Sequence, residues 1–295
     1  MLTLQAHACD EEFRKAMESR TPLETMQVFD HAVNFLLGSS VYSLVSHRSY
    51  AAPCTATVED GFSFRSHPIV AGCTAVWERG DLVLAPSLRV GFSACEISDV
   101  RCSALPWSSE KAIAGLSAFD EHLVSWDFDC GCLAGYRIRR FKESRQMDPM
   151  TACVEWRAMR LLRTAMQGDA VGGAVRGLVG AGIGLTPSGD DYIDGFLCML
   201  GSIDHPDAAA VRARIVKDLL EPGVLQATTA VSRQMLICEC AFRSALPHLR
   251  LVNALLRDAQ DMRPALSELL AIGHTSGADF ASGAASALWE FVSNH

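Results

Sequence analysis

Hydrophobic and polar residues follow different patterns in the two parts of the chain. Residues 40–105 carry short runs in which apolar and polar positions alternate or β-branched residues gather, with Gly, Pro and Asp between the runs. Such runs are typical of strands joined by turns, and they predict a mostly antiparallel strand region. Residues 26–38 fit a strand or a helix equally well, because a short apolar run has no decisive period.

Helical periodicity takes over after residue 110. Residues 110–126 and 151–168 place apolar side chains at positions i, i+3 and i+4, which is the spacing of one helix face. The stretch 127–149 is polar, contains glycine and ends in proline, so we interpret it as the join between two parts. The helical spacing predicts six further helices, over residues 190–203, 207–220, 227–242, 247–260, 263–272 and 278–293.

The predicted fold class is therefore α+β. We expect a β-rich N-terminal region over residues 1–135 and a helical region over residues 145–295. The chain of 295 residues is long enough for one large domain or two modest ones. Hydrophobic residues make up 49% and charged residues 20% of the sequence, which is ordinary for a globular protein with a real core.

The charge of the chain argues against two classes of partner. The formal net charge is -8, and Lys and Arg form no long block. Nucleic acids and anionic membranes attract basic surfaces, so we expect neither as a partner. No apolar run approaches the roughly 18 residues of a membrane span. The first twenty residues also lack the basic start and apolar core of a secretion signal.

The eleven cysteines indicate a reducing compartment. Their number is odd and they are scattered through apolar contexts, which suits the cytoplasm better than a disulfide framework. The pairs Cys130/Cys132 and Cys238/Cys240 have one residue between their cysteines, whereas zinc sites use C-x2-C pairs with matching partners. We therefore expect buried thiols, a cytoplasmic protein and no metal ligands at these pairs.

The stretch GIGLTPSGDDYIDGFL, residues 182–197, combines a glycine-rich turn with the start of an apolar helix. Thr186 suits the N-cap and Pro187 the first helical position. Gly189 leaves the backbone uncovered by a side chain. Free N–H groups and the helix dipole favour an anion there, such as a phosphate or a carboxylate.

Three aspartates follow in the same helix. Asp190 and Asp191 near a helix start complement its dipole, which is one interpretation. With Asp194 they also form a carboxylate cluster that can hold Mg²⁺ against a phosphate or bind a polar substrate. Mg²⁺ is thus the candidate cofactor, although no cofactor is assigned firmly. The G-K-[ST] ending of a phosphate-binding Walker loop is absent.

The motif is repeated 88 residues later. Residues 188–195 and 276–283 share the pattern S-G-x-D-[YF]-x-x-G, so Asp191 corresponds to Asp279. Each copy has a Ser that we expect to cap its helix, a bare Gly, a carboxylate in the first turn and a second Gly one turn later. We infer that the two helices pack together and present their N-termini to one site. A structural duplication without a ligand is the alternative.

Residues between and beside the two copies extend the candidate site. Thr228 and Thr229 stand where a helix would begin, and their position raises the chance that they line the same pocket. His274 is a candidate general acid or anion donor, with a structural role in the turn as the equal alternative. A Ser188–His274–Asp191 hydrolase triad is disfavoured, because Ser188 is not in a G-x-S-x-G elbow.

Three segments together resemble a known family. LTPSGDD before an apolar helix, then TTAVS, then LLAIGHTSGAD are similar in order and spacing to the AllH-type subunit of oxamate carbamoyltransferase. The resemblance covers roughly residues 170–290, and LLAIGHTSGAD is its most specific part. Ile183 stands where members of the family often have proline.

The resemblance implies a role in allantoin and purine degradation. The enzyme interconverts oxalurate plus phosphate with oxamate plus carbamoyl phosphate, and it assembles from several kinds of subunit. We expect this chain to be one subunit of such a hetero-oligomer, acting on a small anionic substrate. We assign catalytic roles to His274, Asp191 and Asp279. The substrate-binding residues are expected to be Thr186, Ser188, Gly189, Asp190, Thr228, Thr229, Thr275, Ser276 and Gly277.

Two other function classes stay open on the sequence. One is a non-catalytic subunit that binds a metabolite or acts as a scaffold for a catalytic chain. The other is a metal-dependent transferase or hydrolase that acts alone on a small phosphorylated molecule. Whether this chain is itself an enzyme therefore remains undecided at this level.

Overall fold

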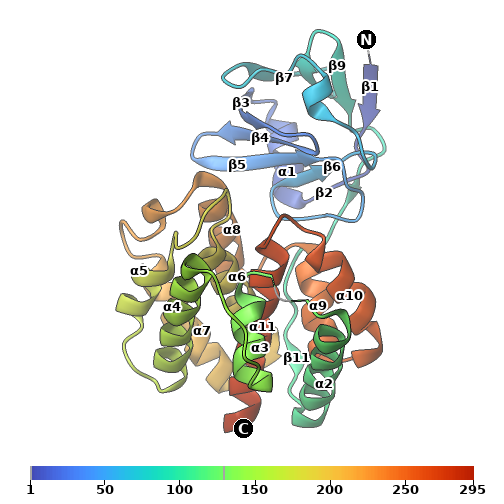
Figure 1. The fold of residues 1–295 in the computed structure, drawn as a ribbon. Helices are drawn as coiled ribbons and strands as arrows, with labels where there is room; N and C mark the ends of the chain where they lie inside the picture. The colour runs from blue at the N-terminus through green and yellow to red at the C-terminus, as the bar shows by residue number, and fades with distance from the viewer. Residues whose placement is uncertain (1, 129) are drawn as a thin grey trace. The chain divides into compact units, whose positions relative to one another are not determined.

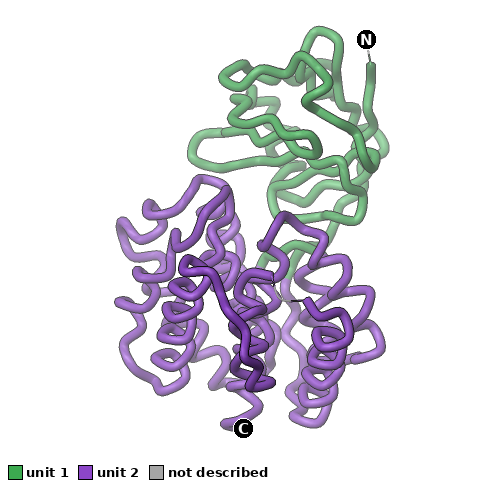
Figure 2. The backbone as a smooth tube through the Cα atoms, in the orientation of Figure 1, with its two compact units in different colours: residues 1–101, 243–246 green, residues 102–242, 247–295 purple. Residues whose placement is uncertain are grey.

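The computed structural model describes residues 2–128 and 130–295. It divides into two compact units, coloured separately in Figure 2. Unit 1 consists of Met1–Arg101 with Arg243–Leu246, and unit 2 of Cys102–Phe242 with Pro247–His295. The α+β class is confirmed, with a sheet in unit 1 and helices in unit 2. The expected domain bounds, 1–135 and 145–295, stay a prediction.

Unit 1 is built on a curled mixed sheet (Figure 1). Its ten strands are β1 Leu2–Gln5, β2 Ala8–Cys9, β3 Leu23–Val28, β4 Ala32–Leu37, β5 Ser40–Val45, β6 Thr55–Thr57, β7 Thr74–Glu78, β8 Asp81–Ala85, β9 Leu88–Gly91 and β10 Glu96–Ile97. They follow the order β1-β9-β8-β7-β3-β4-β5-β6-β2-β10. Helix α1, Glu11–Ser19, and the 3-10 turn η1, Phe64–Ser66, lie in the same unit.

The expectation of mostly antiparallel strands is confirmed. Six of the nine neighbouring pairs in this sheet are antiparallel, and the parallel ones are β1/β9, β2/β10 and β5/β6. The ambiguous residues 26–38 belong to β3 and β4, which pair as a hairpin. These residues form strands, in which Val33 and Phe35, two positions apart, place their side chains on the same buried face.

Unit 2 is helical. Its helices are α2 Ser109–Trp126, α3 Cys132–Phe141, α4 Pro149–Met166, α5 Gly172–Leu178, α6 Ser188–Ser202, α7 Pro206–Leu219, α8 Ala230–Cys240, α9 Leu246–Leu256, α10 Met262–Leu270 and α11 Ser276–Asn294. Two 3-10 turns, η2 Leu225–Ala227 and η3 Ala259–Asp261, and a short parallel pair, β11 Leu105–Pro106 with β12 Ile203–Asp204, complete it. Among the helices of the described residues, none combines the length and hydropathy needed to cross a bilayer.

The eight helices expected after residue 110 are all present. Two more were not expected, α5 and α3, and α3 lies inside the stretch interpreted as the join, residues 127–149. The polar residues of α3 form ion pairs with other helices, which the sequence pattern did not indicate. Arg139 forms an ion pair with Glu155, and Arg140 donates to Asp120 at 2.7 Å.

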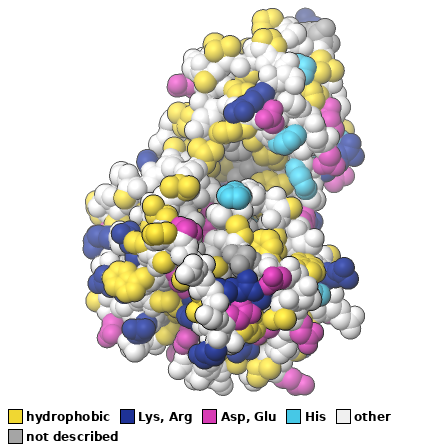
Figure 3. Space-filling view, in the orientation of Figure 1, with side chains coloured by type: hydrophobic (Ala, Val, Ile, Leu, Met, Phe, Trp, Pro, Cys, Tyr) yellow, Lys and Arg dark blue, Asp and Glu magenta, His cyan; other side chains and the backbone are white. Residues whose placement is uncertain are grey.

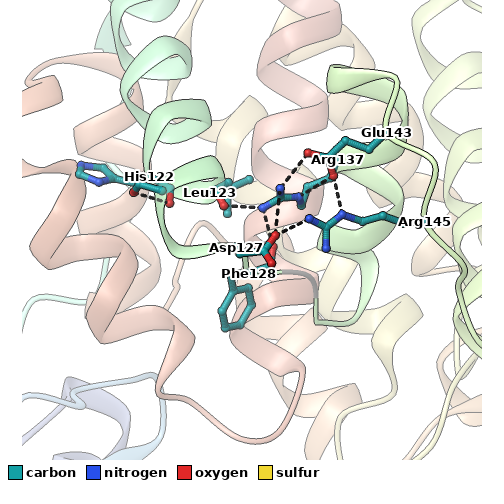
Figure 4. A network of polar contacts seen from close by, with 8 residues as sticks. His122, Leu123, Asp127, Phe128, Arg137, Glu143 and Arg145 are labelled. Carbon is teal, nitrogen blue, oxygen red and sulfur yellow. Dashed lines mark hydrogen bonds and ion pairs between the residues drawn. The ribbon is translucent and has the colours of Figure 1, made fainter.

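Arg137 anchors this region (Figure 4). Its guanidinium is only 2% exposed and donates to both carboxylate oxygens of Glu143, at 3.0 and 2.8 Å. It also donates to the carbonyl oxygens of Leu123 and Phe128. Arg145 joins Glu143 to Asp127 from the other side. These charge-assisted bonds connect α3 with the end of α2 and with the residues that follow α3.

Helices α6 and α11 cross at two glycines in the helical unit, where Figure 1 places both near the middle. A Cβ atom on Gly195 would lie 2.1 Å from the carbonyl oxygen of Phe280, and one on Gly283 would lie 2.1 Å from that of Tyr192. Gly195 corresponds to Gly283 and Tyr192 to Phe280 in the repeated motif. The contact is therefore two-fold symmetric, and the expected packing of the two helices is confirmed.

We predict that Gly195→Ala and Gly283→Ala destabilise the helical unit by about 1–3 kcal/mol, the cost of overpacking a tight core. Their methyl groups must push two backbones apart. Thermal unfolding of the full chain measures this. Gly177→Ala is the matched control, because it lies in α5 with no atom within 4 Å of its Cβ position. Equal midpoints for Gly177→Ala and Gly195→Ala would contradict the tight crossing.

Candidate functional site

The first helix start is held by backbone contacts between α5 and α6. The N–H of Ala181 donates to the carbonyl of Leu178 at 3.0 Å, and the N–H of Gly189 donates to that of Ala181 at 2.8 Å. A Cβ on Gly189 would lie 2.3 Å from the oxygen of Leu178. Glycine is required here because the end of one helix touches the start of the next.

The second helix start repeats these contacts between α10 and α11. The N–H of Ile272 donates to the carbonyl of Leu269 at 3.0 Å, and the N–H of Gly277 donates to that of Ile272 at 3.3 Å. A Cβ on Gly277 would lie 1.9 Å from the oxygen of Leu269. The N–H groups of both motif glycines are thus already bonded within the chain. Their role as anion donors stays a prediction.

The expected caps differ from the observed ones. Helix α6 begins at Ser188 with Pro187 at the cap position, and α11 begins at Ser276 with Thr275 at the cap position. Neither residue caps its helix through its side chain. The expectation that Thr186 caps the first helix and that a Ser caps each copy was wrong. The hydroxyls of Thr186 and Ser276 instead bond to each other at 2.7 Å and link the two helix starts.

Asp190 ties α6 to the start of α8. It is fully buried, and its Oδ1 accepts from the N–H of Gly180 at 2.8 Å. Its Oδ2 accepts from the hydroxyls of Ser232, at 2.7 Å, and Thr228. Burial raises the pKa of Asp190, and these donors act against the rise. Ser232, which was not among the assigned residues, is a full member of this cluster.

Asp194 points to another part of the unit. Its Oδ2 lies 3.3 Å from Nδ1 of His248, whose ring stacks on Phe280 with centroids 3.8 Å apart. Successive residues of a helix point about 100° apart, so Asp190, Asp191 and Asp194 reach three different surroundings. The expected cluster of three carboxylates therefore separates into two structural contacts and one remaining group, Asp191.

Asp191 and Asp279 are the central pair of the candidate site. Both are almost completely buried, and each has one carboxylate oxygen, Oδ2, without a hydrogen-bond partner among the described residues. The other oxygen of Asp279 accepts from the N–H of Cys132 at 2.7 Å. An unpartnered buried polar atom is rare and costly in folded proteins, so this pair is the strongest candidate for ligand contact.

Burial also changes the protonation of the pair. Burial raises the pKa of Asp191 well above its usual range, and the neighbouring charge of Asp279 raises it further. Burial likewise raises the pKa of Asp279, while the Cys132 N–H and the Ser188 hydroxyl act against the rise. The hydroxyl of Ser276 acts in the same way on Asp191. Each Ser thus serves the aspartate of the other helix.

A metal ion at this pair would need further ligands. Two carboxylates and neighbouring hydroxyls are oxygen donors, which suit Mg²⁺. The octahedral shell of Mg²⁺ would have to be completed by water or by substrate oxygens. Within residues 2–128 and 130–295, the groups of three ligand atoms spaced for an ion lie elsewhere, at Cys102/Cys198/Glu239 and His205/Asp207/His295.

The remaining assigned residues surround these aspartates to different degrees. Thr229 caps α8 by accepting from the N–H of Ser232 at 3.1 Å, and its hydroxyl donates to the carbonyl of Leu185. Thr229 therefore has a capping role, whereas Thr228 donates to Asp190. His274 is exposed, and its carbonyl accepts from the Cys130 thiol at 3.4 Å. Its catalytic role stays a prediction.

Two groups of residues near the site were missed. One is Gly131 with Cys132 at the start of α3, where a Cβ on Gly131 would lie 2.4 Å from Oδ1 of Asp279. Gly131 has a φ of 55°, which favours glycine. The sequence signal was the glycine itself, but nothing in the sequence paired it with a residue so far along the chain.

The other group is a cationic pocket beside the first glycine turn. A cavity of about 300 Å³ is lined by three arginines, by Trp156, which is 64% exposed, and by the backbone of Gly180 and Ala181. The arginines are Arg157, Arg160 and Arg176. Basic and hydrophobic side chains lie next to each other on the side of the unit that α4 and α5 form (Figure 3). Such a pocket suits a phosphate or another anion.

A comparison with known families tests the resemblance that the three motifs indicate. Residues 178–288 match the family model of the oxamate carbamoyltransferase subunit AllH. The AllH match runs from the end of α5 into α11 and contains the Gly195–Gly283 crossing, Asp190, Asp191 and Asp279. The resemblance inferred from the three motifs is thereby confirmed over these residues. Among curated proteins and among solved structures, none matches this chain.

We predict that Asp191→Asn and Asp279→Asn stabilise the protein at neutral pH by about 0.5–2 kcal/mol, the usual range for a single stabilising substitution. A carboxyl with a raised pKa in the folded state stabilises it fully below the unfolded pKa, near 4. That stability is lost as the pH rises through the folded pKa. An amide cannot ionise and so avoids the loss.

Thermal midpoints measured from pH 4 to pH 8 test this. The difference between each variant and the wild type should grow as the pH rises. Asp169→Asn, at an exposed loop position, serves as the charge-matched control and should stay within about 0.5 kcal/mol at every pH. A site-residue variant that is less stable than the wild type at pH 8 would refute the account of the buried pair.

Proposed function

We propose that this chain is the AllH-type subunit of a carbamoyltransferase. The enzyme would interconvert oxalurate plus phosphate with oxamate plus carbamoyl phosphate, within ureide degradation. The family match over residues 178–288 supports the subunit assignment. Within that region, the observation that carries the proposal is the pair Asp191 and Asp279, each with a buried oxygen that lacks a partner.

The chemistry of the substrate fits this pair. Oxalurate carries a ureido group, whose N–H groups donate and whose carbonyl accepts hydrogen bonds. A carboxylate oxygen accepts from an N–H, and a protonated carboxyl donates to a carbonyl. The raised pKa of Asp191 favours its protonated form, and the hydroxyls of Thr186 and Ser276 beside it can turn to donate or accept. Such bonds are strong in a buried site of low dielectric.

The two aspartates would have different roles in the carbamoyl transfer. A phosphate oxygen attacks the carbamoyl carbon, and the bond from that carbon to the oxamate nitrogen breaks. The electron pair of this bond stays on the nitrogen, which takes a proton. Asp191 would supply this proton, and the proton that the phosphate loses would restore the carboxyl group. Asp279, whose orientation the Cys132 N–H fixes, would position the ureido group.

Phosphate requires positive charge, which the aspartate pair does not supply. The pocket of Arg157, Arg160 and Arg176 lies beside Gly180, whose N–H also binds Asp190. We therefore assign the attraction of phosphate to these arginines. Guanidinium groups match the geometry of phosphate oxygens through paired N–H donors. The other subunits of the assembly would complete the active enzyme.

We predict that Asp191→Asn lowers carbamoyl phosphate formation by the assembled enzyme at least about 100-fold, the low end for removal of a general acid. The assay uses oxalurate and phosphate as substrates. It is run on the purified chain and on the complex that a tagged copy retrieves from its native cells. Activity is expected in the complex alone.

Asp169→Asn is the control variant and should retain full activity, since it is exposed and outside the site. An Asp191→Asn complex that is intact and fully active would refute the assignment of the site. A complex that binds oxalurate without turnover would instead identify a metabolite-binding subunit. Turnover by the isolated chain that EDTA abolishes would identify a stand-alone metal enzyme.

A further inference from the structure

Three side chains from distant parts of the sequence meet in the helical unit, away from the two helix starts. Cys102 precedes β11, Cys198 lies on α6 and Glu239 lies on α8. The two Sγ atoms are 3.8 Å apart, and Sγ of Cys102 lies 3.8 Å from Oε1 of Glu239. The three atoms all lie within 4.8 Å of one another. Cys198 is seven residues, or about 10 Å along the helix, from Asp191.

These separations match the edges of a tetrahedral metal site. A zinc ion binds thiolate sulfur at about 2.3 Å and carboxylate oxygen at about 2.0–2.2 Å. Tetrahedral angles then place two bound sulfurs about 3.8 Å apart and a sulfur and an oxygen about 3.6 Å apart. The two 3.8 Å distances agree with these edges to a few tenths of an ångström, and the third separation, between Sγ of Cys198 and the Glu239 carboxylate, is no more than 4.8 Å.

The ligands are held by neighbouring backbone bonds. The N–H of Cys102 donates to the carbonyl of Phe242 at 2.8 Å, just beyond the end of α8. Arg212 donates to the carbonyl of Glu239, and its guanidinium lies 3.5 Å from the centre of the Phe242 ring. The ligand atoms therefore come from elements that are already joined, as a preorganised metal site requires.

Burial makes a cation at this place favourable. The side chains of Cys198 and Glu239 are fully buried, whereas Cys102 is half-buried and provides access from solvent. A cation held by the two sulfurs and the carboxylate would interact favourably with the Glu239 charge, because Coulomb interactions are strong in a buried place of low dielectric. The spacing argument against the C-x-C pairs does not apply here, because these cysteines are 96 positions apart.

We propose that Cys102, Cys198 and Glu239 form a binding site for a thiophilic divalent cation of the zinc class. Water completes the tetrahedron on the side of Cys102. Binding releases the two thiol protons; the two thiolates balance the charge of the divalent ion, and the Glu239 carboxylate leaves the bound site with one net negative charge. The ion joins α6 to α8, the two helices that Asp190 also links through Ser232. The site is distinct from the aspartate pair, so its test does not depend on the proposed reaction.

The test uses the full-length chain, reduced and stripped with a chelator, and titrated with Co²⁺ as the spectroscopic probe. We expect one equivalent to bind tightly, with a thiolate-to-cobalt charge-transfer band and tetrahedral d–d bands. Two protons should be released per ion, and Zn²⁺ should displace the cobalt. Failure of the reduced wild type to bind one equivalent would overturn the proposal.

Variants identify the ligands. Cys198→Ser and Glu239→Gln should weaken Co²⁺ binding by at least about 100-fold, because loss of residues that merely orient metal ligands already costs up to about that factor. Cys9→Ser, which alters a buried thiol of unit 1, is the matched control and should bind as the wild type does. Circular dichroism checks the fold of each variant.

If Cys198→Ser does not fold, Cys102→Ser at the half-buried position provides the same test. A charge-transfer band that persists in the folded Cys102→Ser and Cys198→Ser variants would refute the ligand set. So would a Cys102–Cys198 disulfide in protein isolated under thiol-blocking conditions, detected by mass spectrometry. In that case the pair would be a redox couple instead of a metal site.

Discussion

The crossing of α6 and α11 is the contact on which the candidate site depends. Gly195 and Gly283 let the carbonyl oxygens of Phe280 and Tyr192 approach to distances that no side chain would permit. Because the same motif supplies both glycines, the close approach also brings two equivalent helix starts together. The hydroxyl pair of Thr186 and Ser276 and the buried aspartates then follow from the position of the helices.

The candidate site buries carboxyl groups, which lowers the stability of the fold but gives the groups the pKa values that acid–base chemistry needs. Asp190 is satisfied by three donors and Asp194 lies against His248, so both contribute to packing. Asp191 and Asp279 keep an oxygen without a partner and have raised pKa values. Such groups cluster at functional sites, because a bound ligand can form the hydrogen bond that no other residue of the chain provides. The family match over the same region supports this interpretation.

Much of the helical unit could be predicted from the sequence, because helix periodicity and the repeated motif are local signals. They located α6 and α11 and paired Asp191 with Asp279. Contacts between residues far apart in the sequence could not be predicted, because no local pattern links Cys132 to Asp279 or Cys102 to Cys198. Helix α3 was missed because its stretch is polar and contains glycine, whereas Arg137 is buried in an ion-pair network. The caps were misplaced because hydroxyls bond across the site rather than to their own helix.

The central claim is that the two helix starts act as one site on one bound molecule. A double-mutant cycle on kcat/KM of the assembled enzyme tests it most directly, with Asp191→Asn, Asp279→Asn and the double variant. If both aspartates act on the same substrate, the double variant should lose far less than the product of the two single losses. Losses that multiply would show two independent groups, and full activity in both single variants would contradict the account altogether.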